Sequence, residues 1–184
     1  MTTTTLPTTL PTGTFAVETS HSQAHFSVRH AGIAKARGTV AIVEGTLVIP
    51  EDRTAATVTA TLDPATVDTR DANRDGHLRT ADFFDVDNHP RWSFASTSVE
   101  TDGDDLLVHG DLTIRGTTRP VTLRTEFNGA ATDPFGTARI GFSASTEISR
   151  KDFGLVWNAA LETGGVLVGD KVTITLDIEA VPAA

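Results

Sequence analysis

The sequence predicts an all-β protein that forms one antiparallel barrel of about eight strands, and three observations support this. Apolar and polar residues alternate with a period of two over most of the chain. Thr, which is β-branched and suits a pleated surface, is unusually frequent. Short turn signals containing Gly, Asp or Pro separate the alternating runs, as expected for strands joined by hairpins.

Length and composition fit a single acidic domain. The chain has 184 residues and no Cys, which excludes disulfides, a thiol nucleophile and a thiolate metal site. Its formal net charge is -9, and a protein of this charge repels phosphate backbones. We therefore expect no nucleic-acid partner.

The clearest strand lies at residues 172–179, where apolar residues take every even position and polar residues every odd one. Only a strand places such a set on one face. The same alternation predicts further strands around residues 24–28, 58–62, 92–94, 121–127 and 139–148.

Four short segments predict the turns between these strands. They are Glu44-Gly45, Asp102-Gly103-Asp104, Asn128-Gly129 and Pro134-Phe135-Gly136. Residues of these types favour the backbone conformations that tight turns require.

Residues 65–85 break the alternation, and their Asp, Arg and Ala content predicts a short helical insert on the rim of the barrel. Within it, Asp71, Asn73 and Asp75 have the spacing of the first positions of a calcium loop. Position twelve of such a loop would be Asp82 instead of the bidentate Glu that it needs. We therefore expect an Asx turn and a helix cap at this place.

Residues 1–12 form a Thr- and Pro-rich tract that predicts a disordered tail, and residues 13–181 form the single barrel domain. The tract lacks the positive charge and the apolar run of a secretory signal, so we expect a cytoplasmic protein. A periplasmic or secreted location would follow if a signal had been removed. No stretch approaches the ~18 apolar residues of a membrane span, so we expect no stable membrane insertion.

A barrel of this size is either filled by its own side chains or holds one small ligand. The predicted inner face mixes large residues such as Phe26, Phe94 and Phe142 with small ones such as Ala24 and Ala144. This mixture leaves both outcomes open.

Seven segments in a fixed order carry a resemblance to a known family. They are ETSHS at 18–22, FSVRH at 26–30, DGHLRTADFFD at 75–85, HPRWSFAS at 89–96, GDLTIRGTTRPV at 110–121, SRKDFGL at 149–155 and VGDKV at 168–172. Together they resemble the YceI-like family of bacterial polyisoprenoid-binding proteins, over about residues 13–180.

The resemblance implies an extended, lipocalin-like barrel of eight strands with an apolar tunnel. The tunnel would hold an isoprenoid lipid such as a polyprenyl phosphate or a quinone tail, with no other cofactor and no enzymatic activity. A homodimer is left open. We expect the tunnel wall to contain Phe26, Val28, Phe84, Trp92, Phe94, Ile114, Leu123, Phe142, Ala144, Phe153, Trp157 and Ile174.

A polar or phosphate head group would lie at the tunnel mouth, where we expect His21, His30, Arg115 and Arg150 as its contacts. Arg115 and Arg119 flank a Gly turn that is either an anion cradle or a plain hairpin turn. Arg150 either pairs with an Asp of the helical insert or meets the head group.

The histidines allow a metal alternative. His21, His25 and His30 could be ligands of a zinc site, but we expect structural or rim histidines and no metal.

The leading hypothesis is non-enzymatic binding, storage or transport of an isoprenoid lipid. One alternative is a small-molecule hydrolase or isomerase, which would need a cluster of polar groups inside the barrel. Another is a stress-response interaction module with a filled barrel. The sequence contains no nucleophile elbow, P-loop or Ser-His-Asp order.

Overall fold

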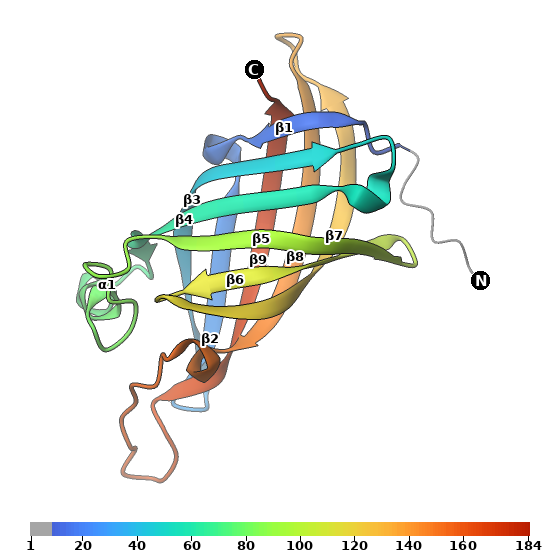
Figure 1. The fold of residues 1–184 in the computed structure, drawn as a ribbon. Helices are drawn as coiled ribbons and strands as arrows, with labels where there is room; N and C mark the ends of the chain where they lie inside the picture. Colours follow the sequence, from blue (N-terminus) through green and yellow to red (C-terminus); the bar gives the residue numbers. More distant parts are fainter. Residues whose placement is uncertain (1–8) are drawn as a thin grey trace.

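The computed structural model describes residues 9–184, which form one antiparallel sheet that closes on itself (Figure 1). One α-helix, α1 (Ala72–Arg79), and three short 3-10 segments, η1 (Thr19–His21), η2 (Arg53–Ala55) and η3 (Arg150–Phe153), connect the strands. The strands are β1 (Gly13–Val17), β2 (Gln23–His30), β3 (Ala34–Ile49), β4 (Thr57–Asp68), β5 (Trp92–Asp102), β6 (Asp105–Ile114), β7 (Thr117–Thr132), β8 (Ala138–Ser149) and β9 (Val168–Pro182).

Strands β1 and β2 share one position in the barrel wall. Both run antiparallel to β3 on one side and to β9 on the other, and η1 interrupts the chain between them. Pairing between β3 and β4 closes the wall. The strands therefore occupy eight positions around the barrel, and the predicted fold is confirmed.

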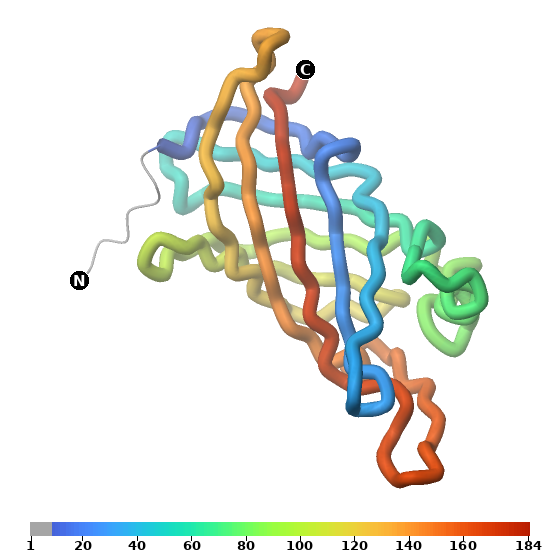
Figure 2. Tube along the Cα trace, turned by 180° about the vertical axis from the view of Figure 1, so that it is seen from behind, coloured from blue at the N-terminus to red at the C-terminus, as the bar shows by residue number. Residues whose placement is uncertain are grey.

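The barrel is flattened, and the strands of its two sides run at a large angle to each other (Figures 1 and 2). Strands β2, β9 and β8 run along one side, and β4, β5 and β6 run across the other. Because side chains alternate along each strand, both sides send an apolar set into the interior. The buried residues form two clusters, one around Phe15, Phe94 and Phe142, the other around Phe84 and Trp92.

Two predicted turns are wrong, because their glycines lie within strands. Strand β3 runs through Glu44-Gly45, and β7 runs through Asn128-Gly129. The register of each strand shifts close to its glycine, which is the pattern of a β-bulge. Gly45 is needed for close approach, since a Cβ there would overlap the side chain of Val17. The turns predicted at residues 102–104 and 134–136 do form.

The helical insert is shorter than predicted, because β4 continues to Asp68 and leaves α1 as the one helix of residues 65–85. Asp71 caps α1 by accepting hydrogen bonds from the backbone of Asn73 and Arg74. The buried Asp75 carboxylate accepts from the Thr69 backbone and hydroxyl. The residues of the calcium-like spacing thus act as a cap and an anchor, as expected from the Asx-turn alternative.

The predicted tail, residues 1–12, lies partly outside the described residues. Within residues 9–12 the structure differs from the prediction, because Leu10 is buried in the core and its carbonyl accepts a hydrogen bond from Arg53. Leu10 is therefore part of the folded core although it precedes Gly13.

Helix α1 has eight residues, and no helix of residues 9–184 has the length and apolar character of a membrane span.

Candidate ligand cavity

The barrel encloses a cavity of about 270 Å³ whose wall is almost entirely carbon. Side chains of both buried clusters line it, from Leu106 and Ile178 in one to Phe84 and Val172 in the other. Protein interiors normally leave few voids larger than a water molecule, which needs about 10–15 Å³. The barrel is therefore open inside, and the alternative of a filled barrel is wrong.

Most of the residues predicted for the tunnel wall do line this cavity. They come from β2, β5, β6, β7, β8 and β9 and from the segment after α1. These residues are Phe26, Val28, Phe84, Trp92, Phe94, Ile114, Leu123, Phe142, Ala144 and Ile174.

Phe153 and Trp157 do not line the cavity, and their predicted place on its wall is wrong. Strands β7 and β8 pair only from Arg124 and Ser145 onward, so they diverge on the η3 side of that point. Phe153 is buried in the second cluster and lines a separate hollow beside the diverging strands. Trp157 packs edge-on against His77, with ring centroids 4.7 Å apart, and lies beside the second cluster.

The wall also contains residues that the sequence analysis did not name. Many of them share the inward parity of the predicted residues, so the alternation could have identified them. They include Val40, Ile42, Leu47, Val58, Leu62, Val108, Leu112, Val172, Leu176 and Ile178.

Arg150 brings a cation to the edge of the cavity. Its side chain is 3% exposed and donates hydrogen bonds to the carbonyls of Gly169 (2.8 Å), Leu155 (2.7 Å), Trp157 (2.9 Å) and Val168 (3.3 Å). Burial lowers the pKa of this guanidinium, and the nearby Asp170 carboxylate opposes that shift. The predicted pairing with an Asp of the helical insert does not occur. Arg150 instead fixes the loop of residues 154–167 across the barrel end.

Arg115 has a similar tethering role at the β6–β7 turn, where its φ of 50° is left-handed. It donates to the carbonyls of Ala81 (2.7 Å) and Gly154 (3.1 Å), which joins the segment after α1 to the chain after η3. Arg119 also lies in this hairpin, and it donates to the neighbouring Thr118 carbonyl. The segment is thus a hairpin turn between β6 and β7, and Arg115 uses its donors to hold two neighbouring segments.

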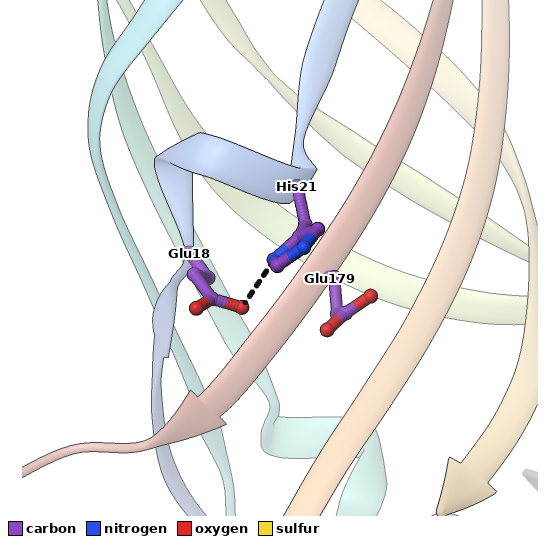
Figure 3. Close-up of side chains that lie close together, drawn as sticks. All are labelled: Glu18, His21 and Glu179. Carbon is purple, nitrogen blue, oxygen red and sulfur yellow. Dashed lines mark hydrogen bonds and ion pairs between the residues drawn. The ribbon is translucent and has the colours of Figure 1, made fainter. Parts of the chain in front are cut away.

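His21 belongs to a polar cluster beside η1 and β9 (Figure 3). Its Nδ1 is 2.9 Å from the Glu18 carboxylate, and Glu179 lies beside them. Arg139 pairs with both carboxylates and with Asp133. His21 therefore belongs to an ion-pair cluster, separate from Arg115 and Arg150, and it does not border the cavity.

His30 ends β2 and is exposed, near the turn to β3. Among the described residues, the trio Glu18, His21 and Glu179 has the spacing of a metal site, without His25 or His30. The Arg139 guanidinium already supplies the positive charge that this trio needs. The three-histidine alternative is not formed.

Comparison with known proteins identifies the family. A sequence model of the YceI-like domain matches residues 15–180. Protein YceI of Escherichia coli O17:K52:H18 (strain UMN026 / ExPEC) is 42% identical over 139 residues, which cover 75% of this chain and 73% of that protein. The chain belongs to the YceI-like family.

Solved structures share the YceI-like barrel. BcnA of Burkholderia cenocepacia superposes with a TM-score of 0.75 at 20% identity, over 89% of this chain and 98% of that one. The Campylobacter jejuni YCEI protein gives 0.67 at 28% identity, over 85% and 90%. A polyisoprenoid binding domain from Saccharophagus degradans, implicated in plant cell wall breakdown, gives 0.67 at 14% identity, over 92% and 98%.

Proposed function

We propose that this YceI-like protein is a non-enzymatic carrier that holds the tail of an isoprenoid lipid, a prenyl phosphate or a quinone, inside its barrel. The observation that carries the proposal is the cavity of about 270 Å³ with a wall of carbon. A prenyl chain offers only methyl, methylene and vinyl groups, so such a wall matches it along its whole length. The polyisoprenoid-binding neighbour from Saccharophagus degradans supports the choice of lipid class.

The energetics favour a long tail over a small ligand. Burial contributes about 0.8 kcal/mol per CH₂, which is about 4 kcal/mol for each five-carbon isoprene unit. Association costs about 4–15 kcal/mol before any affinity appears. A ligand therefore needs several isoprene units inside the barrel for tight binding, because few polar contacts are available to add to the affinity.

The wall supports binding more than catalysis. Arg150 is the one Arg or Lys among the described residues that line it, and its donors mostly point to backbone carbonyls. Thr125, Thr146 and His25 also border the cavity, but no carboxylate does. His25 alternates with the inward Ala24 and Phe26 on β2, and its Nε2 lies 3.8 Å from the carboxylate of Asp177, which is not on the cavity wall. The hydrolase or isomerase alternative requires a general acid or base whose reactive atom faces the cavity, and the His25 ring lies beside the exposed Asp177 carboxylate instead.

Native mass spectrometry of the gently purified protein tests the proposal. We expect a co-purified isoprenoid lipid, or uptake of an added prenyl phosphate or quinone at one molecule per barrel. A straight-chain fatty acid and a short prenyl alcohol serve as controls for tail chemistry and length. A protein that neither carries nor takes up any prenyl lipid would refute the proposed function.

A further inference from the structure

Exposed apolar side chains gather at one end of the barrel. The β2–β3 turn and the loop of residues 154–167 reach this end together in both views (Figures 1 and 2). Ile33 at the tip of the turn is 86% exposed, and Val156 and Val166 of the loop are 63% and 51% exposed. The Ala31 amide donates to the Leu167 carbonyl at 2.7 Å, so the two segments form one surface.

The charge around the β2–β3 turn is opposite to that of the whole protein. The formal net charge is -9, yet residues 19–43 contain no Asp or Glu. Arg29, Lys35 and Arg37 lie on the two strands that flank the Ile33 turn, and all three are exposed. Within residues 9–184 none of them makes an ion pair.

The charges on the neighbouring segments do not cancel these cations. Between residues 150 and 171 the acidic and basic side chains balance: the charged residues there are Arg150, Lys151, Asp152, Glu162, Asp170 and Lys171. Arg29, Lys35 and Arg37 therefore form a local positive cluster around the Ile33 turn, while the more acidic segment of residues 68–91 reaches the loop through the contact of His77 with Trp157.

The cavity runs to this same end. Val28 and Val168 border it, and β2 pairs with β9 through His30 and Val168 directly beside the turn. Exposed aliphatic side chains surrounded by unpaired cations are the combination that binds a bilayer carrying anionic phospholipids. We propose that the β2–β3 turn and the loop of residues 154–167 form a docking surface for such a bilayer, from which a lipid tail enters or leaves the barrel.

The opposite end provides a matched control. The β7–β8 turn lies at the far end of the barrel (Figure 1), and its Phe135 is 93% exposed. Near it, Arg139 is shared by the carboxylates of Glu18, Asp133 and Glu179, so the local charge is negative. An anionic bilayer repels this end although it also exposes an apolar side chain.

The experiment is flotation of the full chain with vesicles of phosphatidylcholine alone and of phosphatidylcholine mixed with phosphatidylglycerol. We expect binding to the anionic vesicles only, weakened by salt. Each cation near an anionic surface contributes roughly a fivefold change in partitioning, so the double variant Lys35→Gln with Arg37→Gln should bind about twenty-five-fold more weakly. Ile33→Asp should also lose binding, and Phe135→Asp should bind like wild type.

The proposed docking surface rests on the proposed carrier function, but separate experiments can refute each of them. Uptake of a prenyl lipid from solution, followed by native mass spectrometry, should be unchanged in the turn variants because they do not border the cavity. The docking surface is refuted if wild-type protein does not float with anionic vesicles, or if the double variant binds them as well as wild type does. Vesicle binding without any lipid uptake would support the surface and refute the carrier.

Discussion

Replacing Ala144 by Trp tests the open cavity directly. Ala144 lies on β8 between Thr125 of β7 and Leu176 of β9, and its side chain borders the cavity. An indole at this position would enter a space of about 270 Å³. We expect the variant to fold and to lose uptake of prenyl lipid, because the indole occupies volume that the tail needs.

The stability of the variant without lipid distinguishes a cavity from a packed core. In a packed core the larger side chain would cost about 1–3 kcal/mol, which lowers the Tm by about 2–12 °C for a chain of this length. In the cavity the indole is removed from water instead. A buried Trp covers about 150–250 Å², which at about 25 cal/mol per Å² stabilises the fold by at most about 4–6 kcal/mol. The variant should therefore melt at or above the wild-type Tm.

Thermal unfolding with and without a prenyl phosphate provides the assay. At a lipid concentration of about one hundred times Kd, the wild type should gain about 2.7 kcal/mol, or roughly 5–11 °C. The Ala144→Trp variant should gain nothing, and Ser145→Trp, on the exposed face of the same strand, should respond like wild type. An Ala144→Trp protein that fails to fold would refute the open cavity. One that shows the full lipid shift would refute occupancy of this region.

Three further predictions concern positions that shape or close the barrel. Gly110→Ala should lower the free energy of unfolding, measured in urea, by about 1–3 kcal/mol, because the added Cβ would overlap the Phe94 ring. A variant as stable as wild type would contradict this contact. Arg150→Met should cost about 3–5 kcal/mol and speed proteolysis of residues 154–167; an unchanged cleavage rate would show that other contacts hold the loop. Arg139→Gln should lower the Tm at neutral pH, because the hydrogen bond from Arg139 holds the pKa of Glu18 below its usual 4.5. Glu18 contributes this stability above its unfolded pKa and loses it as the pH falls through its folded pKa, so the gap in Tm should narrow in acid; a gap that stays constant would contradict the pairing.

Alternation predicted the barrel and most of its wall because burial on one face is a property of each strand alone. Phe26, Phe142 and Ile174 could be placed inside without knowing their neighbours. The structural roles of two glycines were predicted wrongly, because a Gly within an alternating run fits either a turn or a bulge. Gly45 and Gly129 lie at bulges, and only the approach of β1 and the long β7–β8 pairing decides this.

The positions of the side chains at the η3 end of the barrel depend on the course of the chain in space, which the sequence pattern does not predict. Phe153 and Trp157 have the same apolar character as the wall residues, yet both follow the end of β8. Their positions depend on where β7 and β8 stop pairing and how the loop returns to β9. The hydrogen bonds of Arg150 depend on the same loop, since its partners are backbone carbonyls that any residue type could supply.

The cavity persists among large aromatic side chains because of where glycines face them. A Cβ on Gly38 would lie 2.6 Å from Cζ of Phe26, its partner across the β2–β3 ladder, and a Cβ on Gly110 would lie 2.6 Å from Cε2 of Phe94. Each ring therefore covers a glycine on the adjacent strand and lies along the wall. With a side chain at either glycine, the ring would have to turn into the lumen, where it would take space from a ligand. The same Phe residues that would fill an ordinary barrel thus form the surface of this one, because the residues beneath them have no side chains.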